Sequence, residues 1–310
     1  MIYIDAIIYS NLITILVIGF TLTYMIAKIP NFAHGTYAVI GSYVTFTLVE
    51  IFNLNPYLGI PLAFLIVGLI TLLQYYLVIR PMIRLRASML SLMIATIAME
   101  IILSAFIGIY VEYISRNYGK YGVYPSAFIF RGRDFKIFDL PGILVISTVI
   151  LISLVLLLHI MLTRSKIGIA LRALVEDSEL ASNLGINTDL LNALAWFLIG
   201  GLAGMAGSMF PLYIQVTPLT GTYLIITIFA GSMLGGIYSI YGAIVGGYIM
   251  GLTETFGVIF LADILGVWVT AYRLLISLSI LIAILLVLPK GISGLLESYI
   301  ESRILKRISR

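Results

Sequence analysis

Long apolar runs limit what this chain can fold into. Runs of about 20 residues recur along the sequence, and as a helix each is long enough to cross the roughly 30 Å hydrocarbon core of a bilayer. Hydrophobic residues form 61% of the 310 residues and charged residues only 10%, with a mean hydropathy of +1.13. This composition excludes a soluble globular domain and predicts an all-α polytopic membrane protein.

The apolar runs predict eight or nine transmembrane helices. Nine candidate spans are separated by charges, prolines or glycines: 6–27, 36–52, 57–79, 87–110, 141–162, 190–212, 219–236, 243–262 and 267–288. The count stays open because 36–52 could either cross the bilayer or re-enter it. We expect one transmembrane domain over 1–310, with an external loop at 112–140 and cytoplasmic segments at 164–187 and 289–310.

Lysine and arginine indicate the orientation of the spans. Three basic clusters lie on one side in the nine-span count: the turn with Arg80, Arg84 and Arg86, the stretch 164–187, and the tail 289–310. Such residues are enriched in cytoplasmic loops, so this side and the C-terminus should be cytoplasmic. The basic residues of 112–140 argue the other way, but they lie in mid-loop among acidic residues. The net charge of +4 reflects these membrane-flanking clusters and does not indicate nucleic-acid binding.

The stretch 164–187 is the longest run that is both helical in pattern and densely charged. Leu171, Leu174 and Val175 follow the spacing of one helix face. Gly185 follows the last helical residue, at a position where a left-handed cap favours glycine. The pattern predicts a cytoplasmic helix that contacts a partner; an ordinary solvated connector is the alternative.

Two segments interrupt the helical pattern, one in each half of the chain. Pro30 to Gly35 follows the first span, and Gly235 to Gly242 lies between the seventh and the eighth. Transporters built from inverted repeats place broken helices at corresponding positions of their two halves. We therefore expect two inverted repeats with broken helices, although no residue-level repeat is visible in the sequence.

Ionisable residues inside the spans are further clues, because inserting each one costs about 2.5–3.5 kcal/mol. Glu100 lies in the middle of the fourth span and should face protein or a water-filled cavity. Glu254 and Arg273 lie at similar depth in the last two spans, and we expect them to form a structural ion pair. His34 borders the first interruption, where a structural and a functional role are both open.

Patterns typical of enzymes are missing from the sequence. It contains no cysteine, no HExxH and no G-x-x-x-x-G-K-[ST] phosphate loop. We expect a chain without enzyme activity, bound metal or cofactor of its own.

Three segments together resemble one family. Glu179, Ala181 and Gly185 match the Glu-Ala-Ala-x-x-x-Gly motif of a cytoplasmic loop in ABC-importer permeases, with Leu180 replacing the first Ala. Asn31-Phe32-Ala33-His34-Gly35 and the glycine-rich run from Leu234 to Ala243 match two further segments, although Tyr238 and Tyr241 depart from the pattern. From 31 to 292 the chain resembles the permease subunits of branched-chain amino-acid ABC transporters of the LivH type.

The resemblance implies a multi-pass subunit of the cell membrane that works with several partners. These are a second homologous permease, two cytoplasmic ATPase subunits that bind the ATP, and an external substrate-binding protein. The residues expected to couple the chain to the ATPases are Arg172, Glu176, Asp177, Glu179, Ala181 and Gly185. The candidates for the translocation path are Asn31, Phe32, His34, Gly35, Glu100, Gly235 and Gly236.

The sequence leaves the substrate and the energy source open. Related permeases for urea, short amides or other amino acids share these motifs. An alternative from another class of protein is an ion-coupled secondary transporter in which Glu100 binds a proton or sodium ion. Whether the two permeases of the complex are identical is also open.

Overall fold

The computed structural model describes residues 2–288 and 291–295, without the side chains of Ser178, Glu179 and Ala271. Lys290 and the basic residues of 296–310 lie outside the described residues. Besides helices, the described part has a two-stranded antiparallel hairpin of β1 (Lys136–Ile137) and β2 (Leu140–Pro141). The α-helices are α1 (Ile2–Ala27), α2 (His34–Phe46), α3 (Gly59–Gln74), α4 (Arg80–Arg84), α5 (Met89–Tyr118), α6 (Gly142–Arg164), α7 (Lys166–Glu176), α8 (Ser178–Asn183), α9 (Thr188–Met209), α10 (Thr220–Gly235), α11 (Ile240–Leu265) and α12 (Arg273–Val287).

Seven helical segments of the described chain are long and apolar enough to cross a membrane. They are Ile2–Ala27, Pro56–Arg84, Met89–Tyr121, Gly142–Arg164, Thr188–Leu212, Ile240–Leu265 and Arg273–Leu295. The other two predicted spans contain shorter helices. Helix α2 has 13 residues and continues as a π-helical segment, Thr47–Ile51, whereas α10 has 16. The predicted fold class, an all-α polytopic membrane protein, is confirmed.

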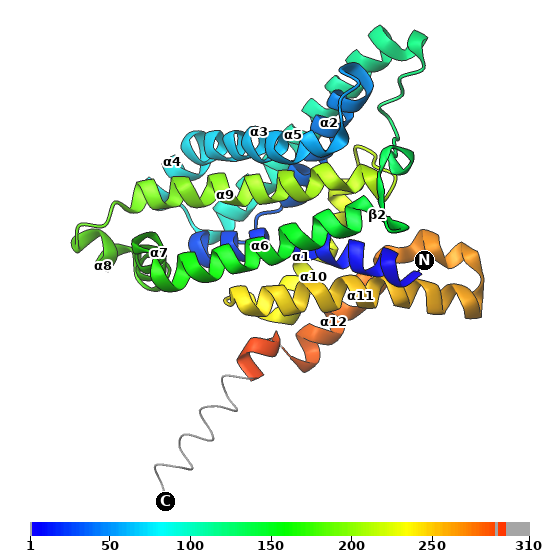
Figure 1. Cartoon of the computed structure of the whole chain (residues 1–310). Coiled ribbons are helices and arrows are strands. Elements are labelled where there is room, and N and C mark those ends of the chain that lie inside the picture. The colour runs from blue at the N-terminus through cyan, green and yellow to red at the C-terminus, as the bar shows by residue number, and fades with distance from the viewer. Residues whose placement is uncertain (1, 289–290, 296–310) are drawn as a thin grey trace, which may run out of the picture.

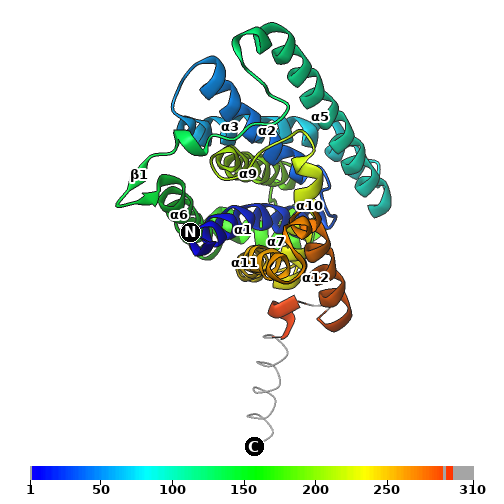
Figure 2. The same cartoon turned by 90° about the vertical axis from the view of Figure 1, so that its right-hand side faces the viewer.

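Helix α1 is the centre of the bundle. Asp5 is its only charged residue, and every residue from Ile8 to Thr23 is buried. A helix that is apolar all round belongs in the interior, where it can be covered on every side. Helices α6, α9, α10 and α11 pack against it. Figure 2 shows α1 between α9 and α11, with α5 crossing at the periphery.

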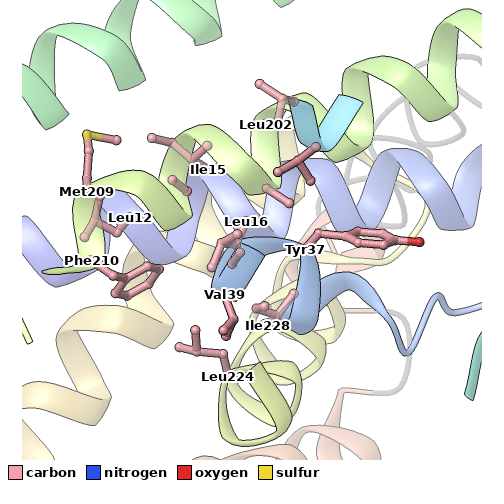
Figure 3. Packing of buried hydrophobic residues seen from close by; sticks show 14 of the residues in the cluster. Leu12, Ile15, Leu16, Tyr37, Val39, Leu202, Met209, Phe210, Leu224 and Ile228 are labelled. Atoms are coloured by element: carbon pink, nitrogen blue, oxygen red, sulfur yellow. The ribbon is translucent and has the colours of Figure 1, made fainter. Parts of the chain in front are cut away.

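The core forms where α1 meets helices from both halves of the chain. Leu12, Ile15 and Leu16 of α1 are completely buried. Around them lie Tyr37 and Val39 of α2, Leu202, Met209 and Phe210 at α9 and its end, and Leu224 and Ile228 of α10 (Figure 3). The start of α2 is therefore held inside the bundle by contacts with helices remote in sequence.

Small residues on α9 allow the closest helix contacts. A Cβ atom placed on Gly207 would lie 1.9 Å from the carbonyl oxygen of Ala38, and one placed on Gly204 would lie 2.6 Å from that of Ala63. No side chain fits at these distances, so glycine is what lets α9 touch α2 and α3 backbone to backbone. Lipid offers no hydrophobic driving force between helices, and close packing of this kind holds membrane bundles together.

The bundle has two distinct ends (Figure 1). One end, here called the hairpin end, carries the N-terminus of α1 and the segment 119–141 with β1 and β2. Asp5 of α1 and Arg131 of this segment form an ion pair of 2.6 Å there. The other end, here called the α7–α8 end, carries α7 and α8 and the ends of α1 and α6.

The charged stretch 164–187 differs from the expected single helix. It forms two helices, α7 and α8, separated at Asp177, whose backbone is extended (φ −151°, ψ 104°). The side chain of Asp177 accepts a hydrogen bond of 2.9 Å from the backbone N–H of Leu180, as an N-terminal cap of α8 does. Aspartate caps a new helix more readily than it continues an old one, which explains the break.

Candidate functional site

Two helices begin in the interior of the bundle instead of at its ends. Helix α2 starts at His34, whose Nε2 lies 3.0 Å from the carbonyl oxygen of Leu16, near the middle of α1. Helix α10 starts at Thr220, and its Gly221 touches Gly35: a Cβ atom on Gly35 would lie 2.1 Å from the oxygen of Gly221. The first turns of α2 and α10 therefore meet inside the bundle.

From this meeting point the two helices run in opposite directions. Along α2, Tyr43 donates a hydrogen bond of 2.8 Å to the carbonyl oxygen of Pro125, which belongs to the segment at the hairpin end. Along α10, Ser232 lies 2.8 Å from Thr21, which is close to the α7–α8 end of α1. Neither helix has a side-chain cap at its first residue. The positive ends of two helix dipoles therefore lie together in the interior.

Glu100 of α5 lies at these two helix starts. Its Oε1 accepts hydrogen bonds from the hydroxyls of Thr36 on α2 (3.5 Å), Ser104 on α5 (3.2 Å) and Thr222 on α10 (3.3 Å). Among the described residues Oε2 has no hydrogen-bond partner, yet it is not a buried unsatisfied atom. One carboxylate oxygen is thus held by three helices, and the other faces open space.

The segment before α2 is anchored by its own polar groups. Asn31 is buried; its side chain accepts from the backbone N–H of Ala33 at 3.1 Å and donates to the hydroxyl of Tyr37 at 3.4 Å. The backbone N–H of Phe32 donates to Thr96 of α5 at 3.4 Å. The predicted path residues Asn31, Phe32, His34, Gly35 and Glu100 therefore lie around one place in the structure.

Gly235 and Gly236 do not belong to this place. They form the turn between α10 and α11, where a Cβ atom on Gly235 would lie 2.0 Å from the oxygen of Gly242 and Gly236 takes a φ of 106°. The neighbouring Tyr238 lies 3.3 Å from Tyr24, near the α7–α8 end of α1. The helix break expected at Gly235–Gly242 is present, because α10 ends at Gly235 and α11 begins at Ile240, but it is a tight turn at one end of the bundle and not a break in its interior.

The second interior helix start is at Thr220. The sequence predicted a span at 219–236, but not that this span begins inside the bundle. A signal was present in Thr217-Pro218, because proline ends one regular segment and favours the start of another. The structure shows the backbone N–H of Thr217 bonded to the hydroxyl of Thr220 at 2.9 Å and the N–H of Thr220 bonded to the oxygen of Thr217. These two bonds close the turn that leads into α10.

Glu254 of α11 is the centre of a second polar cluster. It is 2% exposed and forms an ion pair with Nε of Arg273 at the start of α12. Its remaining hydrogen-bond partners are Tyr9 of α1, Thr227 of α10 and Ser277 of α12, each at 2.9 Å. The guanidinium carbon of Arg273 also lies 4.0 Å from the centre of the Tyr9 ring. Both oxygens of this carboxylate are satisfied by the protein.

The α7–α8 pair presents the charged surface of the α7–α8 end. Arg172, Glu176 and Asp177 are exposed, whereas Ala181 is 1% exposed and packs inward. Gly185 has a φ of 84°, its N–H bonds to the oxygen of Ser182, and the N–H of Ile186 bonds to that of Ala181. These two bonds form the glycine cap expected at this position. The side chain of Glu179 lies outside the described residues.

Fold and site together define the class of protein. Apolar helices span the bundle, two shorter helices begin at its centre, and polar groups of three helices gather at those starts; this is the arrangement of a multi-pass membrane permease. Residues 2–285 match the family described as branched-chain amino acid transport system / permease component. The chain belongs to this family.

Three relatives show how close the similarity is. The probable branched-chain amino acid transport permease protein LivH of Methanocaldococcus jannaschii is 44% identical over 93% of this chain and 90% of its own length. The high-affinity permease protein LivH of Escherichia coli K12 is 31% identical over 90% of each chain. The high-affinity permease protein BraD of Pseudomonas aeruginosa is 30% identical over 90% of this chain and 91% of its own. No solved structure matches.

Proposed function

We propose that this chain is the permease subunit of an ABC importer and forms the path by which branched-chain amino acids cross the cell membrane. The observation that carries the proposal is the meeting of α2 and α10 beside Glu100 in the interior of a branched-chain amino acid permease. A substrate that reaches this point is roughly halfway along α1. Rocking of the helices around it would expose it to one side of the membrane and then to the other.

ATP would supply the energy through separate subunits. The sequence holds no phosphate loop, and the α7–α8 pair offers exposed charges and a hydrogen-bonded glycine cap at one end of the bundle. We assign this surface to contact with an ATPase subunit, two of which belong to the proposed complex. A second homologous permease and an external substrate-binding protein complete the proposed complex.

The proposed orientation places the α7–α8 end in the cytoplasm and the hairpin end outside. Arg80 and Arg84 lie at the α7–α8 end of the bundle, where both pair with Asp189 at the start of α9, at 2.6 Å and 2.8 Å. Basic residues beside spans favour the cytoplasmic side. The N-terminus is then external, because α1 starts at the hairpin end, and the C-terminus is cytoplasmic.

The test is reconstitution in liposomes. The isolated chain should show neither ATP hydrolysis nor concentrative uptake of leucine. Addition of the homologous permease, the ATPases and loaded binding protein should give uptake that depends on ATP. Uptake by the isolated chain under a proton or sodium gradient would instead support the secondary transporter. Uptake of urea or a short amide by the complete complex, without leucine uptake, would move the substrate to another class.

A further inference from the structure

Glu100 presents an unusual carboxylate for the interior of a membrane protein. Its Oε1 accepts three hydroxyl groups, while Oε2 has no partner among the described residues and is not buried. None of the ion pairs between described residues includes Glu100. The nearby starts of α2 and α10 favour a negative charge at this position without supplying a cation. The free oxygen can therefore accept a hydrogen bond from a positively charged group.

The surroundings of Oε1 add further acceptors. Thr36, Ser104 and Thr222 each use their hydroxyl hydrogen toward Glu100 and keep oxygen lone pairs for another donor. An ammonium group carries three N–H donors, so it can bond to the free carboxylate oxygen and to neighbouring hydroxyl oxygens at the same time. The described residues contain no cluster of three or more potential metal ligands from His, Cys, Asp and Glu. The arrangement suits a hydrogen-bonding cation.

An apolar cavity lies beyond Glu100 along the same helix faces, beginning one turn further on. It has a volume of about 370 Å³ and lies between α2 and α5. Leu103 and Ile107 follow Glu100 by one and two helix turns, and Ile40 follows Thr36 by one turn. We call this space the α2–α5 cavity; it is lined by Ile40, Tyr43, Val44, Thr47, Ile70, Leu103, Phe106, Ile107 and Tyr110.

We propose that Glu100 and the α2–α5 cavity form one substrate subsite, in which Oε2 of Glu100 binds the α-ammonium group of an amino acid and the cavity receives its aliphatic side chain. This rests on the proposed function and assigns the chemistry of recognition within the path. A branched aliphatic amino acid carries both groups on one carbon atom, so it can use the acceptor and the cavity together. The free carboxylate oxygen is then neutralised only while substrate is bound.

The transport test uses Glu100→Gln in the complete complex in proteoliposomes. Glutamine keeps the size of the side chain but loses the charge, so leucine uptake should fall about 10- to 100-fold, as expected for loss of a hydrogen bond to a charged group. Glu112→Gln is the matched control. Glu112 is an exposed carboxylate on the same helix, paired with Arg116, and its removal should leave uptake unchanged. Glu100→Gln uptake close to wild type would overturn the subsite.

A thiol experiment tests the subsite even if Glu100→Gln does not assemble. The natural chain has no cysteine, so Thr222→Cys places a unique thiol on this subunit at an exposed position beside Glu100. Relative to their rates with a free thiol, a cationic aminoethyl methanethiosulfonate should react about tenfold faster than its anionic sulfonatoethyl counterpart, because Glu100 attracts the cation. Leucine should slow the reaction. Equal relative rates, or no protection by leucine, would overturn the subsite.

Failure of the proposed function and failure of the subsite give different results. A wild-type complex that does not take up leucine contradicts the proposed function, whatever the thiol shows. A wild-type complex that does take up leucine, with a thiol that shows no preference for the cation, contradicts only the subsite. The double variant Thr222→Cys/Glu100→Gln should lose the preference, which ties the preference to this carboxylate and not to the bundle as a whole.

Discussion

Glu254 and Glu100 are both carboxylates within apolar helices, and the structure treats them in opposite ways. Glu254 is 2% exposed, paired with Arg273 and bonded through both oxygens to Tyr9, Thr227 and Ser277. Glu100 is half-buried, bonded through one oxygen to three hydroxyls, and forms no ion pair with any residue that the structure describes. The comparison shows that a carboxylate in a membrane span is structural where the protein provides hydrogen-bond partners for both of its oxygens. Where one oxygen has no partner, the carboxylate is available to bind a ligand.

The largest expected effect breaks the Glu254 cluster. Arg273→Ala leaves the buried Glu254 carboxylate without its cation in a low-dielectric interior and should lower the free energy of unfolding by about 3–5 kcal/mol. Glu254→Ala leaves the Arg273 guanidinium, whose side chain is 33% exposed, without its partner and should lower this free energy somewhat less. Glu100→Ala should lower it far less, because no opposite charge is left behind. Thermal unfolding of the purified chain in detergent measures all three.

A double-mutant cycle sharpens this prediction. Removal of both Glu254 and Arg273 should destabilise the chain by less than the sum of the two single changes, since neither charge is then left alone. The pair Glu100→Ala and Arg273→Ala serves as the control and should be additive. Additivity for Glu254 and Arg273 as well would show that the contact contributes no coupling energy.

A smaller effect separates the hydroxyl groups of the two clusters. Thr227→Val removes a buried donor to Glu254 and should lower the free energy of unfolding by about 1.5–3 kcal/mol. Thr222→Val removes an exposed donor to Glu100 and should change it by no more than about 0.5 kcal/mol. Chemical unfolding curves of the two variants measure both losses of stability. Equal losses would mean that Glu100 is as much a structural group as Glu254.

A modest loss of stability is expected outside both clusters, at the cap of α8. Valine at position 185 would have to adopt a φ of 84°, which strains a β-branched residue by about 1–2 kcal/mol. Gly119→Val is the control, because Gly119 has neither a positive φ nor neighbours within 4 Å of a Cβ atom.

The functional consequence of this cap should exceed its effect on stability. In the complete complex, Gly185→Val should reduce the stimulation of ATP hydrolysis by loaded binding protein, and so should Glu179→Ala, which removes the carboxylate of the loop motif. Gly119→Val should leave the stimulation intact. If an intact complex of either variant behaves like wild type, α7 and α8 are a solvated connector.

Several features of the fold followed from local sequence. Apolar runs marked the membrane helices because bilayer thickness fixes their length. Gly185 marked the end of a helix because a left-handed φ is inexpensive only for glycine. Asp177 is an exception. Aspartate often caps the start of a helix, but the helical pattern on both sides of Asp177 suggested a single helix.

The sequence predicted only part of the candidate site. The helix break before α2 was predicted from Pro30 and Gly35, which enclose Asn31, Phe32 and His34. The span at 219–236 predicted α10, but the counterpart of the first break was expected at the glycines of 235–242 and not at Thr220, because glycine runs signal both interior breaks and tight turns. Contacts with Thr21, Tyr24 and Gly35 distinguish the two, and these partners are remote in sequence.

By itself, the sequence determined that this chain is a multi-pass α-helical membrane protein with charged residues in its spans, since hydropathy and length act locally along the chain. Only the tertiary structure decided what each of those charges does. Thr36, Ser104 and Thr222 surround Glu100, and Tyr9, Thr227, Arg273 and Ser277 surround Glu254. Whether a carboxylate is satisfied depends on donors brought from other helices, and helix packing alone sets which donors arrive.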